Sequence, residues 1–348
     1  MDKDGRSTVY NKITDKDKIK QINPDNLQLI DDFIEYLESV DRSKGTIKQY
    51  KANLNVFFVW NLENNKNKFF VDLTKREIAK FQNHALNQWG WSPRRIRTVK
   101  ATVSSLSNYI ESILDDEYEG YKPIVRKIES PANEAVREKS IFTVEDIQPI
   151  LDELVKSNHC EKACLLALAL YSGRRKAELT RFKVTYFDDE NLICGGALYK
   201  TPEKMQTKGR GQRGKLLDVY ILAKQFKPYF DYWMQQREKL GIDSEWLFPK
   251  PGNNEKHIDI STIDSWSRTF SNMLGKPFYI HSLRHSFCTS LLEQNLPEGI
   301  VQTIIGWSSS DIRKLMVSVQ SDLCEKFHIK MLEQRYLNIC PKANYTTT

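Results

Sequence analysis

The sequence predicts a mainly α (α+β) protein with two domains: a four-helix N-terminal domain and a mainly helical second domain that carries a small antiparallel sheet. Three observations predict this class. Apolar residues recur at helical spacing through most of the 348 residues. Runs of strand-forming residues, bounded by turn residues, are confined to about residues 182–222. A stretch rich in proline, glycine and charge separates two blocks, each long enough to form its own core.

Residues 1–23 are expected to form an N-terminal extension, and residues 24–118 the first domain. Four helices are expected in that domain, because four blocks of helical periodicity each follow a residue that caps helices well. They should start at Asn23–Pro24, near Thr46, at the capping box of Thr74 and Glu77, and at Ser92–Pro93.

Basic residues gather near the starts of two of these helices. Backbone N–H groups at a helix start also favour phosphates, so these clusters are candidate contacts for a polyanion. The alternative is an ordinary solvated helix face. The candidates are Arg94, Arg95, Arg97 and Lys100 on the fourth helix and Lys48 on the second.

Residues 119–140 are expected to be an interdomain linker, and residues 141–348 the second domain. In the second domain, an apolar helix through residues 163–170 looks buried, and Gly173 ends it. Strands are expected within residues 182–193, 197–200 and 215–222. The basic, glycine-rich segment 207–214 is expected to be a hairpin tip that can approach a duplex closely, or else a flexible solvated loop.

Two segments of the second domain combine groups suited to chemistry on a phosphate. One runs from Gly173 through Arg175 to Glu178, where the carboxylate can pair with an arginine; the other is His281-Ser282-Leu283-Arg284-His285. An arginine fork can grip two phosphate oxygens, and a neutral histidine can exchange a proton near pH 7. The alternative for the second segment is a structural helix start with a buried histidine.

Taken together, these segments resemble the motifs of the tyrosine recombinase (phage integrase) family. The matching patterns are Gly-x-Arg-x-x-Glu-Leu at residues 173–179, His-x-Leu-Arg-His at residues 281–285, and Ile-Ile-Gly-Trp at residues 304–307. The resemblance implies that residues 24–118 are a SAM-like core-binding domain that clamps DNA, and that residues 141–348 are the catalytic domain.

The resemblance also implies roles for individual residues. Arg175 and Arg284 would stabilise negative charge at the phosphorus, and His281 would act as acid or base, supported by His285, which we also expect near DNA. Lys208 would protonate the leaving 5′ oxygen, with Lys204 as a weaker candidate. Trp307 would donate its indole N–H to the phosphate, although it can equally be a core aromatic.

The tyrosine nucleophile is missing from its expected place. The family carries it about ten residues after the Gly-His/Trp pair, but residues 308–320 contain no tyrosine. The first downstream is Tyr336, followed by Tyr345 in a polar tail. Three alternatives stay open. Tyr336 attacks from a longer connection, within its own subunit or in a neighbouring one; or the segment is altered and the nucleophile lost; or the protein binds and bends DNA without cutting it. Tyr336 can also be an ordinary helix residue.

The function implied by the resemblance is site-specific DNA recombination or integration by an enzyme of a mobile element such as a phage. It would form a 3′-phosphotyrosyl link and rejoin the strand without a cofactor. The implied partners are double-stranded recombination sites and further copies of the chain, as a homotetramer; accessory DNA-bending proteins are left open. The alternatives are a catalytically silent DNA-binding relative and a type IB topoisomerase-like enzyme.

Composition sets further bounds. The net charge of +7 suits a polyanionic partner if it is concentrated on one face. No acidic cluster suited to a divalent metal accompanies the arginines, so we expect metal-independent chemistry. The six cysteines form no Cys-x-x-Cys pair and indicate reduced thiols. With no signal peptide and no run long enough to cross a bilayer, we expect a cytoplasmic protein without membrane contact.

Overall fold

The computed structural model describes residues 13–132, 142–207, 215–293 and 296–306. It divides into two compact units, which within these residues are 13–132 and the remainder. Each unit has its own hydrophobic core. Within the described residues, no helix is both long and apolar enough to span a membrane.

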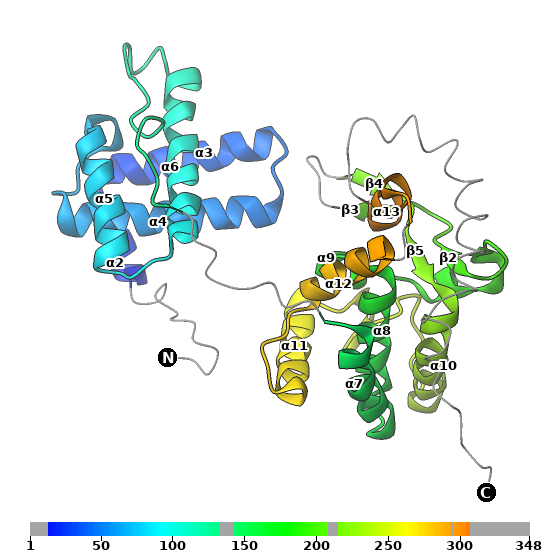
Figure 1. Ribbon diagram of the computed structural model, residues 1–348. Coiled ribbons are helices and arrows are strands. Elements are labelled where there is room, and N and C mark those ends of the chain that lie inside the picture. Colours follow the sequence, from blue (N-terminus) through cyan, green and yellow to red (C-terminus); the bar gives the residue numbers. More distant parts are fainter. Residues whose placement is uncertain (1–12, 133–141, 208–214, 294–295, 307–348) are drawn as a thin grey trace, which may run out of the picture. The chain divides into compact units, whose positions relative to one another are not determined.

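The first unit is a bundle of helices around an aromatic core. Helices α3 and α4 run side by side and α6 crosses them (Figure 1). Phe57, Phe58, Trp60 and Phe81 meet edge to face in the core. The helices are α2 (Lys16–Lys20), α3 (Pro24–Ser39), α4 (Lys44–Asn64), α5 (Lys75–Asn87) and α6 (Pro93–Ile113), with a 3₁₀ turn at Phe70–Asp72.

The expected helix starts are largely confirmed, because each cap makes its hydrogen bond. The Asn23 and Ser92 side chains accept from the N–H groups of Asp25 and Arg95. Thr74 and Glu77 form the full capping box. The second helix begins two residues earlier than expected, where Ser43 is its N-cap.

The expected linker, residues 119–140, starts as part of the first unit. Ile124 and Val125 are buried in that unit's core, and the hydroxyls of Ser107 and Tyr121 lie 2.8 Å apart. Residues 133–140 lie outside the described residues.

The second unit is built around α8, which is buried on all sides. Helices α7, α10 and α12 pack against it (Figure 1). A helix that is apolar all round needs such a cover. The helices are α7 (Val144–Lys156), α8 (Cys160–Ser172), α9 (Lys176–Leu179), α10 (Ala223–Leu240), α11 (Ile260–Leu274), α12 (Ile280–Glu293) and α13 (Glu298–Ile305).

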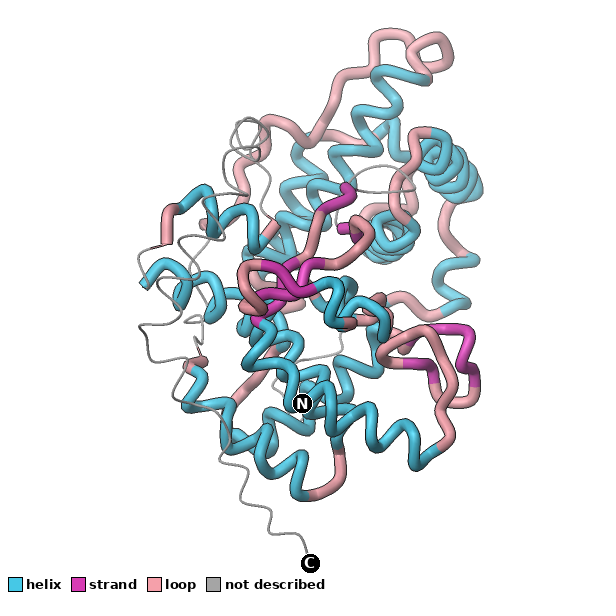
Figure 2. The backbone as a smooth tube through the Cα atoms, turned by 90° about the vertical axis from the view of Figure 1, so that its right-hand side faces the viewer, coloured by secondary structure: helices cyan, strands magenta, loops and turns pink. Residues whose placement is uncertain are grey.

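The strands of this unit are short and form three small antiparallel sheets among the described residues, visible as separate magenta segments in Figure 2. One sheet has the order β1-β2-β5, and the pairs β3-β4 and β6-β7 are hairpins. The strands are β1 (Leu192–Ile193), β2 (Leu198–Lys200), β3 (Met205–Thr207), β4 (Lys215–Leu217), β5 (Tyr220–Leu222), β6 (Pro249–Lys250) and β7 (Asn253–His257).

Two strand predictions need correction. Val184–Phe187 is a 3₁₀ turn rather than a strand. Local backbone bonds close this turn: the N–H of Tyr186 donates to the Lys183 carbonyl and that of Asp188 to the Thr185 carbonyl, the three-residue spacing of a 3₁₀ turn. The expected strand 215–222 is two strands in different sheets: β4 pairs with β3, and β5 pairs with β2. The chain passes from one sheet to the other at Val219, which exchanges hydrogen bonds with Thr201.

Candidate active site

The turn from α8 to α9 forms one wall of the site. Gly173 ends α8 in the left-handed region, at a φ of 59°. A Cβ at this position would lie 2.5 Å from Cδ1 of Phe287, so a side chain has no room there. The Gly173 carbonyl accepts a hydrogen bond of 2.8 Å from Nη1 of Arg284, and this bond joins the turn to α12.

Arg175 stands at the start of α9. Its Nη1 donates to Oε1 of Glu178 at 3.0 Å, and the same carboxylate accepts from the Arg175 backbone N–H. Glu178 is buried, while the Arg175 side chain keeps 32% of its surface exposed. The buried carboxylate therefore holds a guanidinium that a ligand can still reach. The sequence indicates that Glu178 can pair with an arginine, and the structure shows that this arginine is Arg175.

Arg284 enters the site from α12 and is only 4% exposed. Its Nη2 is buried and has no hydrogen-bond partner among the described residues. Burial, and then the positive charges of Arg174 and Arg175, together lower the pKa of Arg284 to about 10. A buried cation with an unpaired donor is costly, and an anion such as a phosphate would relieve that cost.

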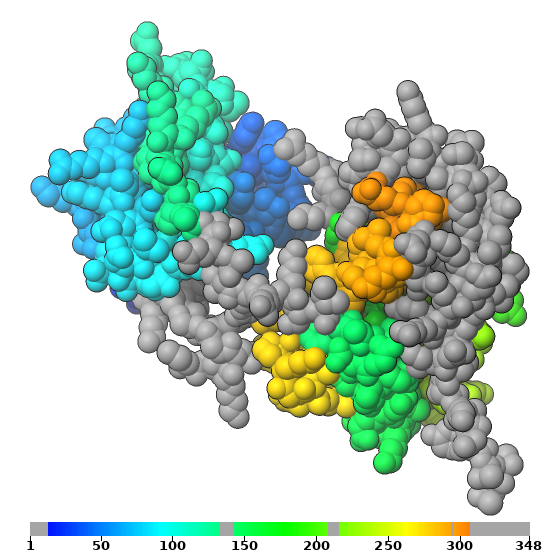
Figure 3. Space-filling view, in the orientation of Figure 1, coloured from blue at the N-terminus to red at the C-terminus, as the bar shows by residue number. Residues whose placement is uncertain are grey.

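His281 and His285 share one face of α12, four residues apart, with ring centroids separated by 5.1 Å and planes at 81°. His281 is exposed, and α12 and α13 (orange) reach the surface drawn in Figure 3. Burial of part of the ring, then His285, Arg284 and Arg175, lower the pKa of His281 below its usual 6.5. The ring is therefore neutral at pH 7 and able to accept a proton.

Arg174 received no role from the sequence. It is 1% exposed, and it donates through Nε to the Ser172 carbonyl at 3.2 Å and through Nη2 to the Ile304 carbonyl. It therefore ties the end of α8 to the end of α13, and its charge acts on nearby Arg284. The Arg-Arg dipeptide signals two cations, but the sequence alone does not indicate which one is buried.

The structure thus brings together Arg175, His281, Arg284 and His285. The other residues predicted to be catalytic, Lys208, Trp307 and Tyr336, lie outside the described residues. Lys204, the weaker candidate for the general acid, is exposed just before β3. No group of three or more metal-binding side chains occurs in the described part of the chain.

The basic residues predicted in the first unit divide into two groups. Arg94 and Lys48 are exposed, and their charged side-chain groups make no hydrogen bond or ion pair with a described residue. Arg95 is half-buried, with Nη1 donating to Asn53 at 2.8 Å and its guanidinium over the Trp91 ring. Arg97 is exposed but donates twice to the Pro131 carbonyl.

Lys100 does not fit the predicted phosphate contact in this arrangement. It is 5% exposed, and its Nζ lies 2.7 Å from Oε1 of Gln82 and 2.9 Å from the Ile128 carbonyl. The Glu129 carbonyl and the Ser130 hydroxyl also accept from it. The ammonium is therefore enclosed by Gln82 and residues 128–130, and its hydrogen bonds hold this part of the expected linker against α5 and α6. Burial, and then the charge of Arg97, lower the pKa of Lys100.

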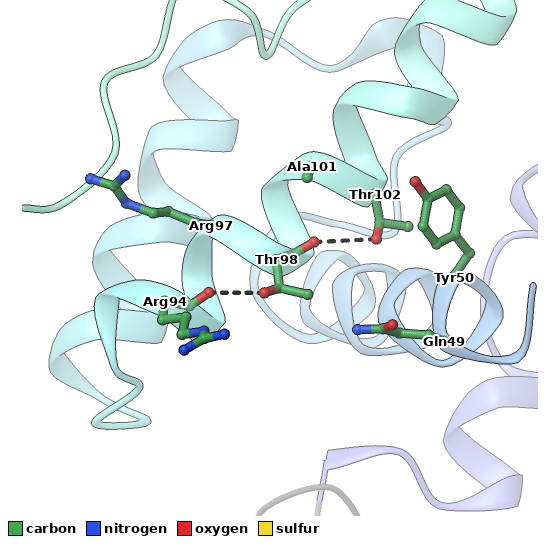
Figure 4. Close-up of a pocket in the computed structure, with 7 residues that line it drawn as sticks. All are labelled: Gln49, Tyr50, Arg94, Arg97, Thr98, Ala101 and Thr102. Atoms are coloured by element: carbon green, nitrogen blue, oxygen red, sulfur yellow. Dashed lines mark hydrogen bonds between the residues drawn. The ribbon is translucent and has the colours of Figure 1, made fainter. Parts of the chain in front are cut away.

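An open hollow of about 380 Å³ lies between α4 and α6 of the first unit. Arg94 and Gln49 extend toward each other across part of it, whereas Arg97 points away (Figure 4). The hollow thus offers guanidinium, amide and hydroxyl groups to a ligand. Its lining residues are Gln49, Tyr50, Arg94, Arg97, Thr98, Ala101 and Thr102.

Comparison with known proteins decides the family. The profile of the phage integrase family matches residues 140–316, and that of the phage integrase N-terminal SAM-like domain matches residues 29–120. This chain belongs to the phage integrase family. As a family member it is a site-specific DNA recombinase, as its motifs predict.

Individual relatives agree with this assignment. The chain is 29% identical to the SPbeta prophage-derived recombinase-like protein YomM of Bacillus subtilis, over 79% of the chain and 80% of the relative. It is 25% identical to the tyrosine recombinase XerA of Pyrococcus horikoshii, over 84% of the chain and 90% of that protein.

The fold is shared with solved recombinases. The XerH site-specific recombinase, in its pre-cleavage complex with difH substrate, matches with a TM-score of 0.59 and 15% identity, over 84% of this chain and 93% of that one. The predicted fold class, with a SAM-like N-terminal domain, is therefore confirmed.

Proposed function

We propose that this integrase family member cuts one DNA strand at a specific site, holds it as a 3′-phosphotyrosyl link and rejoins it to a partner strand. The proposal rests on two arginines that lie near each other. Arg284 is buried, and its Nη2 has no hydrogen-bond partner among the described residues, while Arg175 remains accessible. Two fixed cations of this kind suit a phosphodiester that gains negative charge in the transition state.

Each described residue then has a role. Arg175 and Arg284 stabilise the non-bridging oxygens, and Glu178 and the Gly173 carbonyl hold them in place. Neutral His281 accepts the proton of the attacking hydroxyl, with His285 against its ring. Because both cations are set before substrate binds, little reorganisation is needed during the reaction.

The remaining roles rest on the family motifs. We assign Lys208 as the general acid that protonates the 5′ oxygen, Trp307 as an N–H donor to the phosphate, and Tyr336 as the nucleophile. The positive charge comes from arginines, and the sequence places no acidic cluster beside them. We therefore propose chemistry without a divalent metal, which predicts full activity in EDTA.

The first unit supplies contacts to double-stranded DNA under this proposal. Lys48 and Arg94 are exposed cations, and Arg94 borders the hollow between α4 and α6. Such cations bind backbone phosphates independently of sequence. Strand exchange between two sites needs copies of the chain on both, and we propose a homotetramer on DNA.

Incubation of the chain with a nicked suicide duplex tests the chemistry. We expect a covalent protein–DNA adduct that maps to Tyr336 and disappears in Tyr336→Phe. An adduct that persists in Tyr336→Phe contradicts the assignment of the nucleophile, and the absence of any adduct supports the silent DNA-binding alternative. Strand exchange between two labelled duplexes separates a recombinase from a topoisomerase-like enzyme.

The arginine roles have their own test. Arg175→Ala should lower the cleavage rate by at least about 100-fold while leaving most DNA binding intact, because it removes charge stabilisation in the transition state. Exposed Arg268, on α11 of the same unit, provides the matched control, and Arg268→Ala should cleave normally. If Arg175→Ala loses binding outright, Arg175 positions DNA instead.

A further inference from the structure

The β3–β4 hairpin needs an anchor outside itself. Its two strands pair only with each other among the described strands and are not part of the β1-β2-β5 sheet. The register pairs Met205 with Leu217, Gln206 with Leu216 and Thr207 with Lys215. Lys208 follows Thr207 directly in the chain, so whatever holds this strand also sets where Lys208 begins.

Arg181 supplies an anchor for β3. Its Nη1 donates to Oε1 of Gln206 at 2.9 Å, and its Nη2 donates to the Gln206 carbonyl at 2.5 Å. Its Nε donates to the Ala177 carbonyl of α9 at 3.1 Å. One planar guanidinium therefore joins α9 to the middle residue of β3, a geometry that the point charge of a lysine cannot reproduce.

The other strand also meets the site. A Cβ at Gly306, which ends α13, would lie 3.0 Å from Cδ1 of Leu217 on β4. The base of the hairpin is thus held between two elements of the candidate active site. One is α9, which starts after Arg175, and the other is the end of α13, which precedes Trp307 in the chain.

We propose that Arg181 is a positioning residue: by gripping Gln206, it sets the hairpin so that Lys208 reaches the phosphate held by Arg175. The inference rests on the proposed role of Lys208. In the cleavage step the tyrosine oxygen bonds to phosphorus and passes its proton to His281. The bond from phosphorus to the 5′ oxygen breaks, and the Lys208 ammonium gives that oxygen a proton, leaving a neutral amine and a free 5′ hydroxyl.

A change of leaving group isolates this step. A duplex with sulfur in place of the bridging 5′ oxygen expels a thiolate, which needs no general acid because a thiol is far more acidic than an alcohol. Lys208→Met should lose roughly 100-fold or more in cleavage of the oxygen substrate and recover on the sulfur substrate. Arg181→Met should show the same pattern, with a loss of about 10-fold or more on oxygen. A defect in folding or DNA binding would slow both substrates equally.

Three controls accompany these variants. Gln206→Leu removes one acceptor of the clamp and should give a milder loss that sulfur also relieves, whereas Gln206→Glu keeps an acceptor and should cleave normally. Arg268→Met alters an exposed arginine of the same unit and should leave both rates unchanged.

The outcomes separate the two proposals. If the wild-type chain cleaves neither duplex, the proposed cleavage function is wrong. If the wild-type chain cleaves but sulfur fails to rescue Lys208→Met, the role of Lys208 is wrong. In both cases the inference falls as well. If sulfur rescues Lys208→Met but not Arg181→Met, Arg181 is a structural residue and only the inference is overturned. Normal cleavage of the oxygen substrate by Arg181→Met also overturns it.

Discussion

Replacing Gly173 with alanine tests how the α8–α9 turn and α12 fit together. The substitution adds one methyl group at a φ of 59°, 2.5 Å from Cδ1 of Phe287. That separation is too short for two carbon atoms, so either Phe287 or the turn must move. Because the Gly173 carbonyl holds Nη1 of Arg284, movement of the turn also disturbs the proposed phosphate site.

The expected magnitude has two parts. A left-handed conformation costs a residue with a Cβ about 1–2 kcal/mol. Displacing a packed side chain to admit an extra carbon costs about 1–3 kcal/mol more. The smaller entropy of alanine in the unfolded chain offsets up to about 1 kcal/mol. We therefore expect Gly173→Ala to lower the free energy of unfolding by about 1–5 kcal/mol.

Gly275 offers a matched control, because it also ends a helix in the left-handed region, at a φ of 64°, but has nothing within 4 Å of its Cβ position. Gly275→Ala should lose no more than about 2 kcal/mol, because only the backbone strain remains. The measurement is the free energy of unfolding of the second unit, obtained from hydrogen exchange of amides in α8 and α12 of the full chain at increasing urea concentrations. If both variants lose the same stability, the described contact with Phe287 is wrong.

Three further predictions concern charged groups. An NMR titration of His281 should give a midpoint below pH 6.5. Because the pKa is lower in the folded chain, the neutral ring contributes stability above pH 6.5, and this contribution declines as the pH falls from 6.5 to the folded pKa. A midpoint above 6.5 contradicts the geometry. Lys100→Met should speed hydrogen exchange in residues 128–131 without changing the slope of log binding constant against log salt concentration for DNA. Arg94→Met should reduce the magnitude of that slope by about 0.9. A reduced slope in Lys100→Met would instead show that Lys100 contacts a phosphate. Burial would raise the pKa of Glu77, but hydrogen bonds from Lys68 and Thr74 outweigh it and lower the pKa to about 2, so the first unit should lose stability as the pH falls from 4.5 toward 2, and Glu77→Gln should lose less over that range.

The helix starts and the arginine motif could be predicted because their causes are local. Asn23, Thr74 and Ser92 cap their helices with hydrogen bonds that span only two or three residues. The Arg175–Glu178 pair also spans three residues, within one turn of helix. Such features are fixed by spacing along the chain, and the family motifs then indicate what Arg175 and Arg284 do.

The fates of other basic residues could not be predicted, because they depend on contacts distant in sequence. Lys100 looks like its neighbour Arg97 in a basic helix, yet its acceptors come from Gln82 and from residues 128–130. Arg174 reaches Ile304, and Arg181 reaches Gln206. Only the folded chain shows which cations are enclosed and which remain available to a ligand.

The enclosure of Lys100 affects how the first domain can be exchanged between relatives. A chimera joined at residue 118 would keep the ammonium but lose its acceptors at Ile128, Glu129 and Ser130. The transplanted domain would then contain a buried ammonium without these acceptors, and a gap in its core where Ile124 and Val125 pack. The transferable module therefore extends at least through Pro131, and recombinases with altered targeting should be assembled from segments cut beyond that residue.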